Sequence, residues 1–237
     1  MDASLDRVTR YTGAAFLLVF VTSLAAGLLG DAALGGDGPL LVGRVSEHLV
    51  ALRASNLLWV ITGIGIIAMA ALLYAALGGV NRPLALIAFG WWLAEGTMLA
   101  VGALGMYGLL AVGAGTIGAA VSGPEREALA SLFLGVQQGA FTMHMLFFCL
   151  GGLAWYSLML QARIVPRWLA GWGIVGVSLV LANMLVAAWD HDLTLGTIGL
   201  VAMLLYVPFE PVLGTWLVVR GTRARAGQAT QLQGVPA

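Results

Sequence analysis

Charge is the scarcest property of this 237-residue sequence. Only 9% of its residues are charged and 60% are hydrophobic, whereas roughly a quarter of the residues of a soluble domain are charged. The eleven basic residues, all of them arginine, equal the eleven acidic ones, so there is no polybasic patch for nucleic acid. The single cysteine, Cys149, excludes an internal disulfide. This composition excludes a soluble enzyme, a nucleic-acid-binding protein and a disordered chain.

Long hydrophobic runs are what the sequence has instead. They extend over about 20 residues or more, the length that an α-helix needs to cross the hydrocarbon of a bilayer, and turn-forming residues separate them. We therefore predict an all-α membrane bundle of six transmembrane helices at residues 11–30, 57–79, 84–113, 131–161, 168–189 and 193–219. In this prediction residues 1–220 form one membrane domain, and residues 221–237 form a disordered cytoplasmic tail.

The arginines predict how the bundle is oriented. With the N-terminus in the cytoplasm, eight arginines lie on the inner side, and only Arg44, Arg53 and Arg126 lie outside. This distribution follows the positive-inside rule, so we expect both termini to be cytoplasmic. We also expect Trp59, Trp168 and Trp189 to be anchors at the membrane interfaces.

The segment between the first two spans has an amphipathic pattern. Residues 40–53 place Leu41, Val45, Leu49 and Leu52 on one helical face. This pattern predicts an amphipathic helix on the outer surface, with Asp37 as its N-cap.

Four segments resemble a known family. They are residues 73–86, 151–157, 164–169 and 210–221, and they occur in the same order as in the bacterial membrane family called domain of unknown function 4386. The resemblance implies a bacterial inner-membrane protein of about this size. It implies no catalytic residue, because the family has no established activity.

Two glutamates are predicted to lie at membrane depth. Glu95 is about 18 Å from the start of its helix and Glu210 about 15 Å from the end of its helix, at about 1.5 Å per residue. A charged side chain at this depth costs free energy, so we expect each glutamate to have a structural or functional role. Trp91 and Trp92 precede Glu95 by one turn, and Pro208 and Pro211 bracket Glu210. We expect these prolines to release the carbonyls of Leu204 and Val207 from the helix.

The fourth span adds a polar stripe. Gln137, Phe141 and His144 follow at i, i+4 and i+7, with Gln138 one step round the helix. Gly135 and Gly139 predict a close approach of another helix. No H-x-x-x-H or E-x-x-H spacing accompanies His144, so we predict neither a metal site nor a cofactor.

These residues are consistent with three functions. In an enzyme, Glu95, Glu210 and His144 are the catalytic acid and base groups toward an isoprenoid or lipid-like substrate, as in an isomerase or cyclase. The substrate-binding residues are then Trp91, Trp92, Gln137, Gln138, Phe141, Tyr206 and Phe209. In a proton-coupled transporter, the same carboxyls carry the proton and the proline pair is a gate. In a structural or accessory protein, the polar groups only join helices. The predicted partner is a membrane lipid or a hydrophobic small molecule. The sequence is also compatible with a homo-oligomer.

Overall fold

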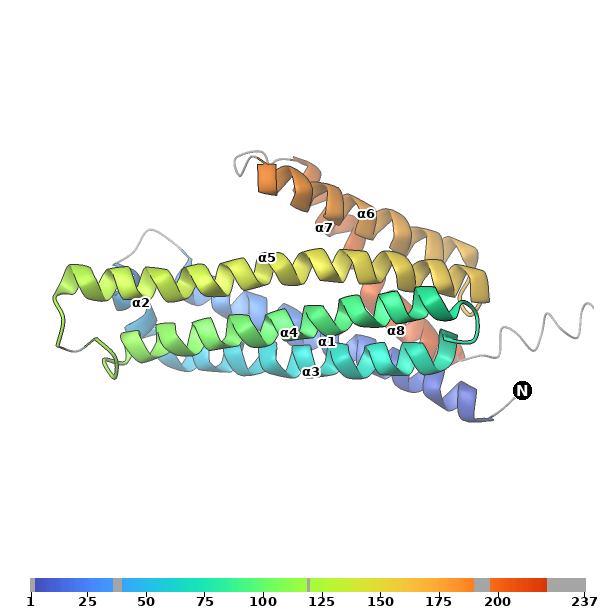
Figure 1. Cartoon of the computed structure of the whole chain (residues 1–237), viewed down its shortest axis with the longest axis horizontal. Helices are drawn as coiled ribbons and strands as arrows, with labels where there is room; N and C mark the ends of the chain where they lie inside the picture. The colour runs from blue at the N-terminus through green and yellow to red at the C-terminus, as the bar shows by residue number, and fades with distance from the viewer. Residues whose placement is uncertain (1–2, 36–39, 119, 190–196, 221–237) are drawn as a thin grey trace, which may run out of the picture. The chain divides into compact units, whose positions relative to one another are not determined.

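The computed structural model describes residues 3–35, 40–118, 120–189 and 197–220. Over these residues the chain is helical and has no strand. Six helical segments are long and apolar enough to cross a membrane, which confirms the predicted all-α fold with six spans. The helices, labelled in Figure 1, are α1 (Ala3–Leu34), α2 (Leu41–Glu47), α3 (Leu49–Leu77), α4 (Arg82–Gly113), α5 (Gly123–Ala162), α6 (Arg167–Trp189), α7 (Thr197–Tyr206) and α8 (Phe209–Arg220).

Helices α1, α3 and α5 each begin eight residues before the predicted span, and α5 is the longest of the described helices. It has 40 residues, which corresponds to about 60 Å or twice the thickness of the hydrocarbon core. Ser122 and Glu125 cap its start: the Ser122 N–H donates to the Glu125 carboxylate, and the Glu125 N–H donates to the Ser122 hydroxyl. This is a capping box, and Pro124 fits the first turn because no N–H is needed there. The helix therefore begins at the cap rather than at the first apolar residue.

The last span is broken where a proline interrupts it. Helix α7 ends at Tyr206 and α8 begins at Phe209, so Val207 and Pro208 lie between them. Pro208 has no N–H for the helical ladder. The carbonyl that loses this N–H is that of Leu204, and the neighbouring Leu205 carbonyl accepts a 2.7 Å hydrogen bond from the Trp172 indole of α6. Pro211 lies in the first turn of α8, where it does not interrupt the helix.

The chain divides into two compact units, and each is described by itself. Unit 1 comprises Met1–Leu18, Gly65–Ala94 and Met145–Ala237, and unit 2 comprises Val19–Ile64 and Glu95–His144. The predicted single domain of residues 1–220 and the orientation of the termini stay predictions. The predicted tail, residues 221–237, lies outside the described residues.

Charged side chains cap three helix ends in unit 2. The Arg44 guanidinium donates to the Leu34 carbonyl at the end of α1, at 2.8 Å. Arg126 donates to the Val112 carbonyl at the end of α4, at 2.6 and 3.2 Å. The Glu127 carboxylate accepts the Leu41 and Val42 N–H groups at the start of α2, at 2.6 and 3.1 Å. These contacts satisfy backbone groups that a helix end leaves unpaired.

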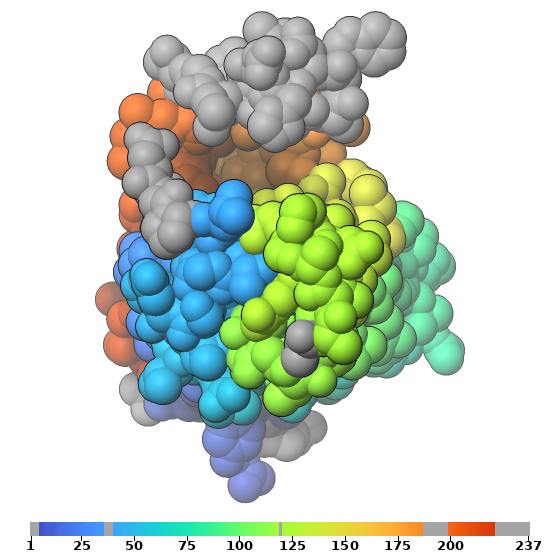
Figure 2. All heavy atoms as spheres, turned by 90° about the vertical axis from the view of Figure 1, so that its left-hand side faces the viewer, coloured from blue at the N-terminus to red at the C-terminus, as the bar shows by residue number. Residues whose placement is uncertain are grey.

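The amphipathic segment is shorter than predicted. Helix α2 ends at Glu47, and Leu49 and Leu52 belong to the first turns of α3. Leu41, Val45 and Leu52 are buried together with apolar residues of α4 and α5, so the apolar face packs on protein. Figure 2 shows α2 in blue beside the green start of α5. The predicted cap, Asp37, lies outside the described residues, and Glu127 accepts the first N–H groups of α2 instead.

Glycines of α4, rather than those of α5, make the close helix contact in unit 2. A Cβ atom on Gly105 would lie 2.9 Å from the Gln137 nitrogen and 3.0 Å from the Phe133 carbonyl oxygen of α5. By contrast, no atom lies within 4 Å of the Cβ position at Gly135 or Gly139. The predicted approach surface on α5 is therefore wrong, because the small residues that allow contact are on the partner helix.

The Arg126 cap predicts a measurable loss of stability. Arg126→Gln removes charge-assisted hydrogen bonds to the end of α4, and we expect it to lower the free energy of unfolding by about 1 to 3 kcal/mol. Arg53→Gln is the matched control, because Arg53 is an exposed arginine at the start of α3, and its effect should stay within about 0.5 kcal/mol. Denaturant unfolding in detergent measures both. Equal effects of the two variants would show that the cap contributes nothing.

The α4–α5 contact predicts opposite effects of one substitution at two glycines. Gly139→Ala adds a methyl group in open space and should stabilise α5 by up to about 1 kcal/mol through helix propensity. Gly105→Ala should destabilise the protein, because its Cβ meets backbone atoms that cannot move away. Thermal unfolding of the two variants tests this. A gain in stability for both would mean that the helices are not in contact at Gly105.

Candidate functional site

A buried carboxyl–imidazole pair lies in unit 2. The Glu95 Oε1 atom of α4 lies 3.6 Å from the His144 Nδ1 atom of α5. The two residues are only 2% and 6% exposed. Glu95 lies 13 positions from the start of the 32-residue α4, which is about 20 Å along the helix. The protein therefore places two ionisable groups in contact where neither can reach bulk water.

Two aromatic rings cover the histidine. The Trp59 ring of α3 lies 6.2 Å from the His144 ring, and the Phe141 ring lies 5.3 Å from it. Trp59 and Phe141 also contact each other edge to face, at 5.6 Å. Trp59 lies ten positions from the start of α3, about 15 Å along the helix, and its predicted role as an interfacial anchor stays a prediction. The side chain of Trp168 is exposed, and that of Trp189 lies outside the described side chains.

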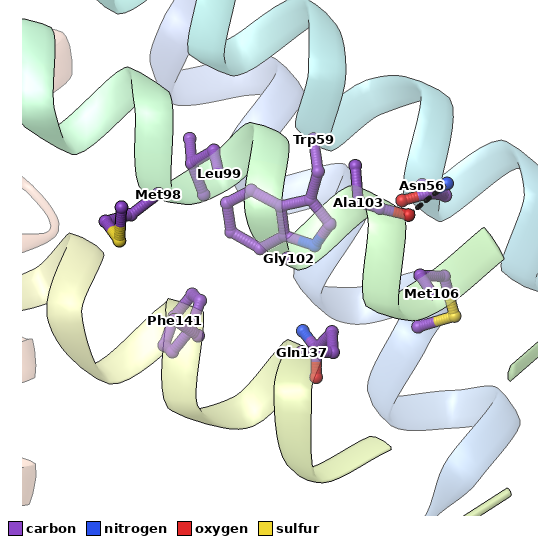
Figure 3. Close-up of a pocket in the computed structure, with 9 residues that line it drawn as sticks. All are labelled: Asn56, Trp59, Met98, Leu99, Gly102, Ala103, Met106, Gln137 and Phe141. Carbon is purple, nitrogen blue, oxygen red and sulfur yellow. Dashed lines mark hydrogen bonds between the residues drawn. The ribbon is translucent and has the colours of Figure 1, made fainter. Parts of the chain in front are cut away.

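A small cavity lies beside these rings. It has a volume of about 10 Å³, which is room for a single water molecule. Figure 3 shows the Trp59 indole reaching from α3 toward Gln137 and Phe141 of α5. The lining is apolar apart from the two side-chain amides and consists of Asn56, Trp59, Met98, Leu99, Gly102, Ala103, Met106, Gln137 and Phe141. The predicted stripe on α5 thus contributes Gln137 and Phe141 to this cavity, and His144 lies against Phe141.

Hydroxyl and amide groups join the helices around this cavity. The Thr62 hydroxyl of α3 donates to the Thr22 hydroxyl of α1, at 2.7 Å. The Ser55 hydroxyl donates to the Ala26 carbonyl at 2.8 Å, and the Asn56 amide donates to the Ala103 carbonyl of α4 at 3.4 Å. Sequence reasoning missed this set because single Ser and Thr residues in an apolar run give no spacing signal. They hold α3 in place, and α3 carries Trp59.

The second glutamate belongs to a polar chain in unit 1. The Tyr206 hydroxyl at the end of α7 donates to the Glu210 Oε1 atom of α8, at 3.2 Å. The Tyr206 and Tyr156 hydroxyl oxygens are 2.6 Å apart. The Phe209 ring is buried and packs on the rings of Tyr156 and Trp172. Tyr206 and Phe209, which were predicted to bind substrate, thus lie around Glu210 at the break between α7 and α8.

The remaining predicted substrate residues have other surroundings. The Trp92 indole is buried against Phe16 and Trp155, and its N–H donates to the Phe148 carbonyl. Trp91 stacks on Phe147. These contacts lie within unit 1. Gln138 is exposed, and its carbonyl accepts a hydrogen bond from Thr142.

The structure therefore groups the predicted residues into two sets. Glu95, His144, Gln137 and Phe141 belong to unit 2, whereas Glu210 belongs to unit 1, so their sharing one cavity stays a prediction. Among the described residues, no group of three or more His, Cys, Asp or Glu side chains could hold a metal ion. The 3.6 Å separation of the Glu95 and His144 side chains is longer than a hydrogen bond, so a small movement is needed to bring the two groups within proton-transfer distance.

The comparisons with known proteins identify the family. The family described as "Domain of unknown function (DUF4386)" matches residues 11–221. The chain belongs to this family, as the sequence predicted, and is a multi-pass membrane protein. No curated protein and no solved structure matches the chain.

The Glu95–His144 contact predicts an energetic coupling. In a double-mutant cycle of Glu95→Gln and His144→Gln, we expect the unfolding free energies to be non-additive by about 0.6 to 1.7 kcal/mol, the range of polar contacts between membrane helices. Denaturant unfolding of the two single variants and the double variant in detergent gives this value. Additive effects would mean that the two side chains do not interact.

Proposed function

We propose that Glu95 and His144 form the acid–base centre of a membrane enzyme that acts on a hydrophobic, isoprenoid or lipid-like substrate. The observation that carries the proposal is the 3.6 Å contact between two ionisable groups that are both almost fully buried at membrane depth. Ionisable groups are expensive in hydrocarbon, and where they occur they usually serve a function. The proposal includes a location in the bacterial inner membrane, with both termini cytoplasmic.

Each group has a role in the proposed chemistry. In the proposed chemistry the Glu95 carboxyl, which lies 3.6 Å from Nδ1, closes to hydrogen-bond distance and orients the imidazole, and His144 transfers the proton, the arrangement by which a carboxylate orients a catalytic histidine. The rings of Trp59 and Phe141 lie beside the imidazole, at centroid distances of 6.2 and 5.3 Å. Aromatic faces stabilise cations. Protonation of an apolar double bond produces such a cation, so the ring environment fits an isomerase or a cyclase.

A substrate would reach the pair from the lipid. The cavity holds only one water in this structure, so side chains at its edge must move to admit a larger molecule. Phe141 is 37% exposed. It lines the cavity, and its ring also contacts the His144 imidazole. A rotation of its ring would open the cavity between α4 and α5. An apolar substrate fits this route because the lining carries only two amides, whereas a path for a hydrated solute would need more polar groups.

The broken last span favours a second candidate function, a proton-coupled transporter. Glu210 lies in the first turn of α8, directly after the break at Val207 and Pro208. Interrupted helices beside an ionisable group are typical of secondary transporters. In that case Glu210 carries the proton and the α7–α8 break opens the path. The enzyme hypothesis also includes Glu210, as a second acid or base.

Variants of the pair test the enzyme. Protein purified in detergent is incubated with a lipid extract of the membrane, and the products are compared by mass spectrometry. We expect turnover with the wild type and a loss of at least about a hundredfold, the contribution of an acid–base group, in Glu95→Gln and in His144→Gln. Glu47→Gln is the matched control, because Glu47 is an exposed carboxyl in α2. Unchanged turnover in either pair variant would exclude the proposed centre.

An apolar replacement of the pair separates function from structure. Buried ion pairs can often be replaced by apolar residues of similar volume without loss of stability. The variant Glu95→Met with His144→Phe should therefore remain folded and lose turnover. A folded variant that keeps its activity would show that the pair only joins helices. Activity that needs sealed vesicles and a proton gradient, and that disappears with Glu210→Gln, would favour the transporter.

A further inference from the structure

A groove follows the face of α8 that the other described helices of unit 1 leave uncovered. The groove is shallow and open, with a volume of about 440 Å³. Its lining consists of Pro211, Val212, Thr215, Trp216, Val219 and Arg220. The opposite face of α8 is buried, because Gly214 and Leu217 pack directly on Gly13 of α1. The groove is therefore a fixed feature of a helix that is held on its other side.

The length of the groove matches one leaflet of a bilayer. From Pro211 to Arg220 the helix rises about 13.5 Å, at about 1.5 Å per residue, and half of the hydrocarbon core is about 15 Å. The walls are mostly apolar over this length, and Val212 and Val219 are 37% and 60% exposed. A face of this length is short for pairing with another helix but matches a single acyl chain.

The end of the groove at Arg220 carries positive charge. The Arg220 guanidinium lies over the Trp216 ring at 5.3 Å, a cation–π contact that fixes its position. Arg220 takes part in no ion pair among the described residues. The sequence after Glu210 has no acidic residue and two further arginines, Arg223 and Arg225. An anionic group is therefore the complementary ligand at this end.

We propose that the α8 groove binds one anionic phospholipid, with its phosphate on Arg220 and an acyl chain along Val212 and Val219. Arginine suits a phosphate because its guanidinium presents several N–H donors in a planar fork. The sequence from Arg220 onward holds only three arginines, which is too few for a broad polybasic surface and favours a single bound lipid. The proposal is independent of the chemistry at Glu95 and His144, and it survives if that chemistry is wrong.

Lipid retention tests this proposal. The full-length protein is equilibrated with vesicles of equal phosphatidylglycerol and phosphatidylcholine, purified in detergent, and analysed by mass spectrometry for retained lipid. We expect Arg220→Gln to lower the retained ratio of phosphatidylglycerol to phosphatidylcholine about fivefold, the effect of about 1 kcal/mol per basic residue. Val219→Trp fills the groove and should reduce the retention of both lipids. Arg167→Gln is the matched control, because Arg167 is also an exposed arginine at a helix end in unit 1.

Several outcomes would overturn the proposal. An unchanged ratio in Arg220→Gln, or an equal fall in Arg167→Gln, would show that the groove does not select the headgroup. Displacement of the lipid by excess inorganic phosphate would show that the acyl chain contributes nothing. If Val219→Trp changes the oligomeric state and leaves the lipid content unchanged, the groove holds a second copy of the chain. Circular dichroism and thermal unfolding confirm that each variant is folded before it is compared.

Discussion

Inside a bilayer, a polar group has no water to bind, so it must find its partner within the protein. This constraint accounts for several of the polar contacts among the described residues. The Glu95 carboxyl lies against the His144 imidazole, and the Thr62 hydroxyl donates to that of Thr22. Beside the break at Pro208, the Trp172 indole N–H donates a hydrogen bond to the Leu205 carbonyl. The apolar surface of a membrane helix can face lipid anywhere, so these polar contacts are what fix which helices meet.

The need to pair backbone groups also gives a reason for two arginines that are predicted to lie on the side of the membrane where the positive-inside rule expects few. Of the three arginines predicted to lie outside, Arg44 and Arg126 each donate to carbonyls at the end of a helix. A guanidinium in this position satisfies unpaired carbonyls and lies favourably at the negative end of the helix dipole. These arginines therefore serve the ends of α1 and α4, whatever they contribute to orientation.

The sequence predicts the spans well because length and apolar composition decide them. The predicted span begins at residue 131, whereas α5 begins at Gly123. Ser122 and Glu125 have the spacing of a capping box, which could have indicated this start. In the same way α3 begins at Leu49, eight residues before the predicted span, because a helix can continue beyond the apolar run that crosses the membrane.

Other features depend on packing and could not be read from one sequence. The glycines of α5 have the spacing of an approach surface, yet the glycines of α4 make the contact, and spacing does not distinguish the two. The cap of α2 comes from Glu127, 86 residues away from Leu41 in the sequence. Glu95 and His144 were each identified as candidates for their depth, but only the packing of α4 on α5 makes them a pair.

The central claim is that Glu95 and His144 act as one acid–base unit at membrane depth. Nitrogen-15 nuclear magnetic resonance of protein labelled in its histidine rings tests the pair most directly, with His144→Gln used to assign the His144 signals. The account predicts that Glu95→Gln shifts the two ring-nitrogen resonances of His144, because the group in contact with Nδ1 changes, and that Glu47→Gln leaves them in place. Unchanged His144 resonances in Glu95→Gln would contradict it.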